Sequence, residues 1–163
     1  VLEMEKMLNE YLQFARSRSA EKTETFNITE LIENTIKRYE KKNIHSDLSQ
    51  RIYTNGRKNL IRRCLNNLID NALKYAQNIK IDLKKTNNNI IIVVDDDGPG
   101  IKKEDRDNVF KPFFKVDKSR GDSKSSVGLG LSIASDIIKS HGGNITLEKS
   151  PMNGLRVRVF LPF

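Results

Sequence analysis

Amide, basic and aromatic side chains recur on one predicted helix at spacings that place them on a common face. Asn67, Asn71, Lys74, Tyr75 and Asn78 follow one another at intervals of 4, 3, 1 and 3 residues. Residues three or four apart in a helix lie on the same face. Amide oxygens suit a magnesium ion, and a lysine suits phosphate, so the stripe is a candidate site for both. Taken alone, the stripe is more typical of an ordinary polar helix face.

A run of acidic residues and glycines directly follows a predicted strand. Asp96 and Asp97 precede Gly98, Pro99 and Gly100. An ionised carboxylate can accept a hydrogen bond from an amino group such as that of adenine. Glycine lets the backbone turn sharply and approach a ligand without a Cβ in the way. Without other signals, this string is also typical of a simple turn.

Two further segments add aromatic residues and a glycine-flanked helix start. Residues 110–114 read Phe-Lys-Pro-Phe-Phe, which could anchor one end of a moving loop, although such residues are more often core. Gly128, Leu129, Gly130 and Leu131 open a predicted helix, where free N–H groups and the helix dipole favour an anion. The Walker lysine motif and a full dinucleotide fingerprint are absent from the sequence.

The elements that must position these residues are helices and adjacent strand pairs. Apolar residues at helical spacing predict helices over residues 1–18, 29–39, 58–76 and 130–140, with Thr29 as the N-cap of the second. Strands are predicted over residues 51–53, 79–83, 90–94, 145–148 and 155–161, with turns at residues 55–56 and 87–89. His45 falls in a predicted polar turn. This order predicts an α+β chain folded as a two-layer α/β sandwich.

The first predicted helix has a second distinctive pattern. Val1, Met4, Leu8, Tyr11 and Ala15 follow a 3,4,3,4 spacing, which is typical of the seam of a helical bundle or coiled coil. The alternative is a surface helix packed on its own domain. We expect residues 1–18 to be part of such a bundle, residues 19–25 to be a linker and residues 26–163 to be a separate domain. Because a helix is already under way at residue 1, we expect a piece of a longer protein.

Composition limits the other possibilities. The 163 residues fit one ordinary domain, and no run of about 18 apolar residues predicts a membrane span. The net charge of +8 comes from scattered basic residues, which favours solvated helix faces over nucleic-acid binding. Cys64 lies in a helical apolar pattern and is predicted to be a small buried hydrophobe. His45 and His141 are distant in sequence and predict no metal cluster.

Together and in this order, the four segments resemble the N, G1, F and G2 boxes of sensor histidine kinases of the EnvZ-like type. Residues 66–75 resemble the N box, residues 94–101 the G1 box, and residues 141–143 the turn after the last helix. The resemblance covers residues 25–163 and extends to the wider superfamily of gyrase, Hsp90 and MutL, known as GHKL ATPases. It implies the Bergerat ATP-binding fold. Residues 1–15 resemble the end of the second helix of the dimerisation and phosphotransfer bundle.

The resemblance also implies a role for each matching residue. Asn71 is implied to bind the magnesium ion that bridges the ATP phosphates, and the implied catalytic residues are Asn67, beside that ion, and Lys74, at the phosphates. Tyr75 is implied to lie against the base or ribose, and Asp96 to accept a hydrogen bond from the adenine amino group. The remaining implied nucleotide contacts, in the adenine wall, the lid and the phosphate site, are Gly98, Gly100, Ile101, Phe113, Lys115, Arg120, Gly128, Leu129, Gly130 and Leu131. Ser126 replaces the first glycine of the family's Gly-x-Gly-x-Gly pattern, which predicts a stiffer lid hinge.

The function that the resemblance implies is the transfer of the ATP γ-phosphoryl group to a histidine absent from this sequence. Relay to the aspartate of a response regulator receiver domain, a homodimer through the helical bundle, and a cytoplasmic position in an inner-membrane sensor follow from the same resemblance. The cofactors implied are ATP and Mg²⁺, and no nucleic-acid partner is expected.

Three alternatives differ in class. An ATP hydrolase of the gyrase or Hsp90 type would have a glutamate where Asn67 stands, and an amide cannot take up a proton usefully at neutral pH. A serine-directed anti-sigma kinase of the same fold lacks a preceding bundle, so the helix over residues 1–15 argues against it. A nucleic-acid-binding module rests on charge alone and predicts strongly salt-dependent binding.

We expect this chain to bind Mg-ATP without phosphorylating itself. The resemblance implies that the reactive histidine sits on the first bundle helix, in a His-Glu/Asp-x-x-Thr-Pro-like context, and neither His45 nor His141 has that setting. Incubation with labelled ATP should therefore leave both histidines unlabelled. Label on either one would contradict this expectation.

Overall fold

The computed structural model describes residues 2–40, 42–112, 114 and 129–162. Its helices are α1 (Leu2–Ala20), α2 (Ile28–Lys37), α3 (Lys58–Tyr75) and α4 (Gly130–Ser140), with short 3-10 helices η1 (Lys103–Asp105) and η2 (Asn108–Phe110). Its strands are β1 (Glu24–Asn27), β2 (Asn43–Asp47), β3 (Tyr53–Gly56), β4 (Asn78–Lys85), β5 (Asn89–Asp96), β6 (Asn144–Lys149) and β7 (Leu155–Pro162).

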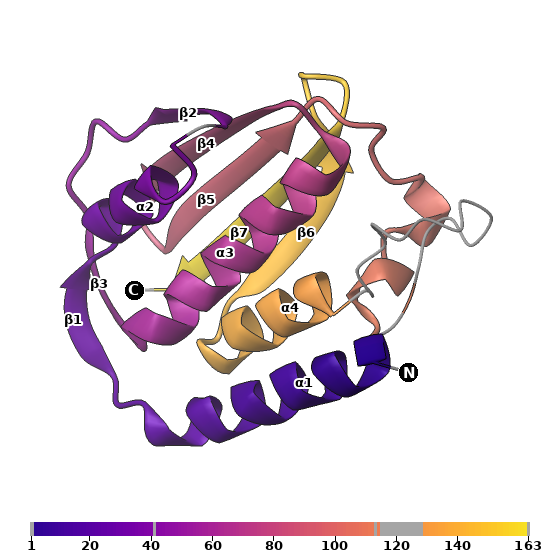
Figure 1. The fold of residues 1–163 in the computed structure, drawn as a ribbon. Helices are drawn as coiled ribbons and strands as arrows, with labels where there is room; N and C mark the ends of the chain where they lie inside the picture. The colour runs from indigo at the N-terminus through magenta and orange to yellow at the C-terminus, as the bar shows by residue number, and fades with distance from the viewer. Residues whose placement is uncertain (1, 41, 113, 115–128, 163) are drawn as a thin grey trace.

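Five strands form the main sheet in the order β2-β4-β5-β7-β6, with β5 in the centre. β2 pairs with β4 in parallel, and the other neighbours pair antiparallel. α3 and α4 lie side by side on one face of this sheet, while β1 and β3 form a separate two-stranded ribbon (Figure 1). The predicted two-layer α/β sandwich is confirmed.

The core lies between the sheet and the helices, where the buried face of the strands packs against the apolar stripe of α3. Alternate residues of β5 face the helices, and Ile90, Ile92 and Val94 are all buried. α3 presents one apolar stripe to them, which includes Leu65 and Leu68. The residues of the central strand and of α3 that face each other therefore form a continuous core.

Cys64 belongs to the same apolar stripe of α3. It is 1% exposed and carries a free thiol, as its predicted core position requires. Burial raises the pKa of this thiol to about 12, so it stays protonated and unreactive at neutral pH. None of the helices in the described parts of the chain combines the length and apolarity needed to span a membrane.

The segment predicted as a linker is largely structured. α1 continues to Ala20 and β1 begins at Glu24, so only residues 21–23 of the predicted linker over 19–25 lie outside regular elements. Glu21 is bound to the domain, because its carboxylate accepts the backbone N–H groups of Asn59 at 2.8 Å and Leu60 at 3.0 Å. These N–H groups lie in the first turn of α3, where a helix has no internal acceptors for them.

The predicted N-cap of α2 is wrong. Asn27 is the N-cap, and its side chain accepts the N–H of Glu30 at 3.0 Å. Thr29 is buried instead, where its hydroxyl donates to the carbonyl of Gln50 at 2.8 Å and accepts the N–H of Ile52 at 2.9 Å. The threonine therefore ties α2 to the segment before β3, a long-range contact that local capping rules do not describe.

Two predicted turns are strands. Asn55 and Gly56 belong to β3, because they pair with Thr25 and Glu24 of β1. His45 lies in β2 and pairs with Lys80 at the edge of the main sheet. Both errors arise because pairing with a distant strand supplies the hydrogen bonds that a turn would otherwise have to provide.

His141 joins the end of α4 to the start of α3. Its Nε2 accepts the backbone N–H of Arg57 at 3.0 Å, and its Nδ1 lies 2.7 Å from the carbonyl oxygen of Ile137. The ring must therefore be neutral, with its proton on Nδ1. Burial lowers the pKa of His141 below its ordinary value of 6.5. The Arg57 side chain reinforces the junction by donating to the Ser140 hydroxyl at 2.6 Å.

This junction predicts a pH-dependent stability. The pKa of His141 is lower in the folded chain than in the unfolded chain. The neutral ring therefore contributes to the free energy of unfolding above pH 6.5, and this contribution is lost as the pH falls through the pKa of the folded chain. Urea unfolding between pH 8 and 5 should show this loss. The variant His141→Gln should be about 1 kcal/mol less stable at pH 8 and lack that component. The variant His45→Gln, on an exposed strand, should keep it, and an unchanged pH dependence in His141→Gln would contradict the assignment.

Candidate functional site

α3 presents its polar stripe on the side away from the core. Asn67 and Asn71 are half-buried on this helix, whereas Tyr75 is 54% exposed at its last residue. Asn78 does not belong to the stripe, because α3 ends at Tyr75 and Asn78 is the first residue of β4. Its amide nitrogen donates to the carboxylate of Asp97 at 2.8 Å. The stripe therefore ends one helical turn earlier than the sequence predicts.

Asn67 has an unsatisfied amide group. Its Nδ2 atom is buried and has no hydrogen-bond partner within the described parts of the chain. Leaving such a donor unpaired costs about 1–3 kcal/mol, so an acceptor supplied by a ligand would relieve it. The backbone carbonyl of Asn67 is also the nearest atom, at 3.8 Å, to a Cβ built on Gly130. Asn67 therefore lies beside the start of α4.

The start of α4 offers backbone groups rather than side chains. Leu129 is the N-cap, and both Leu129 and Leu131 are buried in the core, at 5% and 6% exposure. The N–H groups of the first turn, which include those of Gly130 and Leu131, have no acceptor within a helix and carry partial positive charge. Any contact of these residues with a ligand is therefore made through the backbone.

Lys74 adds a cation to the same face of α3. Its pKa lies below the ordinary value because of partial desolvation, although the carboxylates of Asp70 and Glu10 act in the opposite direction. Asp70 itself accepts the hydroxyl of Tyr39 at 2.8 Å. The lysine therefore lies one helical turn from the Asn71 amide and also within the electrostatic influence of two carboxylates.

Asp96 ends the central strand with a buried carboxylate. It is 5% exposed, and its Oδ1 accepts the N–H groups of Gly98 at 2.9 Å and Leu155 at 3.0 Å. Burial raises the pKa of Asp96 above its ordinary value, while these two N–H groups act to lower it. The second oxygen, Oδ2, has no hydrogen-bond partner among the described residues. One oxygen thus holds the carboxylate in place, and the other is available to a donor.

Close packing around Asp96 requires glycine at two positions. A Cβ on Gly98 would lie 2.8 Å from the backbone oxygen of Tyr75, and one on Gly154 would lie 2.2 Å from Oδ1 of Asp96. Gly154 also donates its N–H to the backbone oxygen of Asp96 at 3.1 Å. The end of α3, the Asp96 loop and the β6–β7 turn therefore meet at one point. Gly154 is a site residue that the sequence analysis did not identify.

The loop after Asp96 carries two more of the predicted residues. Gly100 has a φ of +73°, a conformation that favours glycine, and packs near Gly154. Ile101 is half-buried against the core, and its carbonyl accepts the side chain of Arg106 at 3.1 Å. Phe110, which ends η2, also packs partly against the core. These residues shape one wall of the site.

Several predicted site residues lie outside the described residues, namely Phe113, Lys115, Arg120 and Gly128, together with Ser126 of the predicted hinge. Their roles stay predictions.

Asp95 and Asp97 flank the site aspartate and have structural roles that the sequence analysis did not assign. Asp95 forms an ion pair with Arg156 on β7, and Asp97 accepts the N–H groups of Gln77 and Asn78 at 2.9 and 3.0 Å. Hydrogen bonds from Asn78 hold the pKa of Asp97 below its ordinary value. The one signal in the sequence that points to these roles is the run of three aspartates at a strand end.

The site is elongated and has different chemistry at its two ends. Asp96 lies near the last residue of α3, and the start of α4 lies near Asn67, eight residues earlier, or about 12 Å along the helix axis. One end accepts a hydrogen bond, and the other offers N–H groups, amides and a lysine to an anion. A nucleoside triphosphate has this length and this division between an amino-bearing base and phosphates.

The side chains present also fit a magnesium ion that arrives with phosphates. Within the described residues, no three His, Cys, Asp or Glu side chains gather as a metal site. Magnesium commonly keeps waters and phosphate oxygens as ligands and needs only one or two protein oxygens. The half-buried amide of Asn71, on the phosphate side of the site, can supply one.

Comparison with known proteins gives independent information on the family. A sequence model of the family described as histidine kinase-, DNA gyrase B-, and HSP90-like ATPase matches residues 56–163. The sensor histidine kinase CpxA of Escherichia coli (strain K12) is 34% identical over 108 residues, which cover 66% of this chain and 24% of CpxA. The chain thus spans about a quarter of the length of the curated relatives it matches.

Solved structures extend the likeness to the fold. The catalytic domain of histidine kinase ThkA superposes with a TM-score of 0.74 at 27% identity, covering 86% of this chain and 97% of that one. Full-length ShkA in complex with AMPPNP superposes with a TM-score of 0.75, covering 97% of this chain and 35% of that one. At 21% identity, the likeness to ShkA shows the fold alone.

The glycine contacts predict effects of different size for the same substitution at two site positions. Gly98→Ala should lower the free energy of unfolding by about 1–3 kcal/mol, because its Cβ would meet the Tyr75 carbonyl oxygen at 2.8 Å. Gly130→Ala is the control, since the nearest described atom to its Cβ is the Asn67 backbone oxygen at 3.8 Å, and it should cost less than about 0.5 kcal/mol. Urea unfolding of both variants measures the difference, and equal stabilities would contradict it.

Proposed function

Because this chain belongs to the histidine kinase-, DNA gyrase B- and HSP90-like ATPase family, we propose that in the whole protein it transfers the γ-phosphoryl group of ATP to a histidine outside this sequence. The chain is an ATP-binding catalytic domain of the sensor histidine kinase type. The phosphoryl group then passes to an aspartate of a response regulator receiver domain. The observation that carries the proposal is the alignment of Asp96, the Asn67–Asn71 amides and the start of α4 along one helix.

Asp96 recognises the adenine base in this proposal. Its Oδ1 is occupied by two backbone N–H groups, so Oδ2 is left to accept the amino group of adenine. Gly98 and Gly100 keep side chains out of the way of the base, and the exposed ring of Tyr75 lies against the base or ribose. A purine with an amino group at position 6 therefore fits better than one without it.

The phosphate end of the proposed site uses neutral amides, a cation and a helix start. Asn71 offers its amide oxygen to the magnesium ion, and the unpaired nitrogen of Asn67 donates to a phosphate oxygen. Lys74 and the first N–H groups of α4 add positive charge. Lys115, Arg120 and Gly128 belong to the same proposal as further phosphate contacts, with Phe113 bracing the lid. These groups position the phosphates and neutralise charge, which is most of what phosphoryl transfer requires.

Asn67 also favours transfer to a histidine over hydrolysis. A hydrolase of this superfamily places a glutamate at that position to activate water, and an amide cannot act as that base at neutral pH. We therefore expect slow ATP turnover by this chain in the absence of its phosphoryl acceptor.

α1 supports a homodimer through a helical bundle. Phe14 is 1% exposed and is packed on the domain, with the Arg63 guanidinium 5.6 Å from its ring centroid. The large apolar side chains that remain exposed on α1 are Leu2, Met4, Leu8, Tyr11 and Leu12. Full-length ShkA covers 97% of the chain, against 86% for the ThkA catalytic domain, so the likeness in fold extends over more of this chain in the longer protein. We place the domain on the cytoplasmic side of an inner-membrane sensor, where ATP and receiver domains are available.

Two substitutions test the nucleotide site. Asn71→Asp and Asp96→Asn should each weaken Mg-ATP binding by at least about tenfold in a calorimetric titration, because each alters one polar group that meets the ligand. Asn59→Asp adds the same charge to the first turn of α3, far from the site, and should leave the affinity unchanged.

Unchanged ATP affinity in both site variants, with the fold intact by circular dichroism, would remove this assignment. Rapid ATP turnover that Asn67→Ala abolishes would instead favour a hydrolase.

A further inference from the structure

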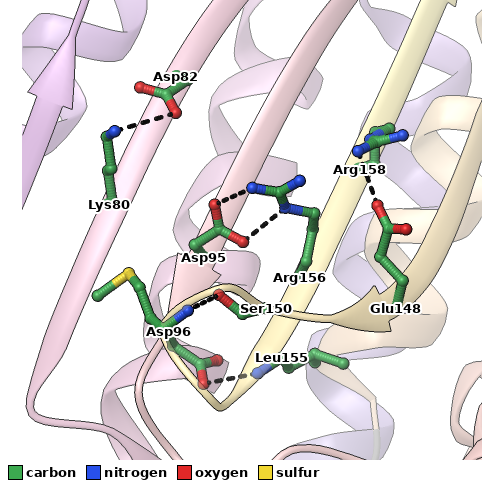
Figure 2. A network of polar contacts seen from close by, with 10 residues as sticks. Lys80, Asp82, Asp95, Asp96, Glu148, Ser150, Leu155, Arg156 and Arg158 are labelled. Atoms are coloured by element: carbon green, nitrogen blue, oxygen red, sulfur yellow. Dashed lines mark hydrogen bonds and ion pairs between the residues drawn. The ribbon is translucent and has the colours of Figure 1, made fainter.

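Two successive residues of β7 bind two successive aspartates of β5. The N–H of Leu155 donates to Oδ1 of Asp96 at 3.0 Å, and the Arg156 guanidinium binds both oxygens of Asp95, at 2.8 and 2.9 Å. Because side chains alternate across a strand, Asp96 lies on the helix-bearing face and Asp95 on the outer face of the sheet. Figure 2 shows the Asp95–Arg156 pair on that outer face, with the Asp96–Leu155 contact at the adjoining turn.

The ion pair stands at the last rung of the β5–β7 ladder. Asp95 pairs with Arg156 in the strand register, and beyond this rung the chains are joined by the Gly154 N–H to the Asp96 carbonyl at 3.1 Å. The Asp95 side chain is only 4% exposed and the Arg156 side chain 24%, so the pair is largely shielded from water. Its geometry is bidentate, which fixes orientation as well as distance.

The Leu155 N–H is the donor to the Asp96 carboxylate that comes from outside the loop after Asp96. The other donor to Oδ1, the Gly98 N–H, lies two residues further along the same loop and moves with it. The position of the Leu155 N–H depends on where β7 begins, and Arg156 is the next residue. We propose that Arg156, through its pair with Asp95, is a positioning residue that orients the Asp96 carboxylate for the 6-amino group of adenine. This inference rests on the proposed nucleotide site.

The test compares two ligands that differ only at the 6-amino group. Mg-ATP and Mg-purine riboside triphosphate, which lacks that group, are titrated into the chain by calorimetry. Wild type should prefer ATP by at least about tenfold, the effect of one hydrogen bond to a charged acceptor. Arg156→Gln should remove most of this preference by weakening ATP binding about tenfold while leaving the affinity for the purine analogue within about twofold. A general loss of structure would weaken both ligands alike.

A matched control lies two residues along the same strand and face. Arg158 pairs with Glu148 at 2.7 Å, but their side chains are 34% and 44% exposed and lie away from Asp96. Arg158→Gln should leave both affinities unchanged. Arg156→Lys keeps the charge without the two-pronged geometry, so it should fold and show an intermediate preference. An undiminished preference in both Arg156 variants, or equal losses for both ligands, would overturn the proposal.

The variant Asp96→Asn distinguishes a failure of the proposed adenine contact from a failure of the proposed role of Arg156. If this variant keeps the wild-type preference for ATP, the proposed role of Asp96 fails. If it loses the preference while both Arg156 variants keep it, Asp96 recognises adenine but Arg156 does not position it.

Discussion

A carboxylate buried at the end of a central strand must find hydrogen-bond donors, and the structure around Asp96 is built to supply them. Its Oδ1 receives one N–H from its own loop and one from β7, and the backbone of Gly154 closes over it. Three segments distant in sequence can approach this closely only because Gly98 and Gly154 have no Cβ. Both of these N–H groups bind Oδ1, and the second oxygen is the one that the proposed adenine contact uses.

α3 converts this local arrangement into a site of defined length. Its apolar stripe is anchored in the core, so its polar stripe is held at a fixed distance from the sheet. Both ends of the helix are bound by distant groups: Glu21 and the Arg57–His141 junction at its start, and Asp97 at the turn into β4. The acceptor at one end of the site and the helix start at the other are therefore held in a constant relation.

The three consecutive aspartates show how one short segment serves different purposes. Asp95 faces the outer side of the sheet and pairs with Arg156, while Asp96 faces the helices and Asp97 binds the backbone of the α3–β4 turn. Strand alternation separates the first two, and the end of the strand releases the third. The carboxylates do not gather into a common acidic cluster, so Asp96 can act as a single hydrogen-bond acceptor with its own surroundings.

Local sequence patterns determined much of the secondary structure and of the core. The helical periods of α3 and α4, the alternation in β5 and β7 and the buried position of Cys64 could all be predicted, because each depends on neighbours within a few residues. The order of four motifs also indicated the family. Only the tertiary structure decided that Thr29 ties two segments together instead of capping α2, that Asn78 binds Asp97, and that Gly154, Leu155 and Arg156 surround the site aspartates. Those contacts join residues about 20 to 60 positions apart, and they form because sheet register and close packing bring them together, which no local periodicity encodes.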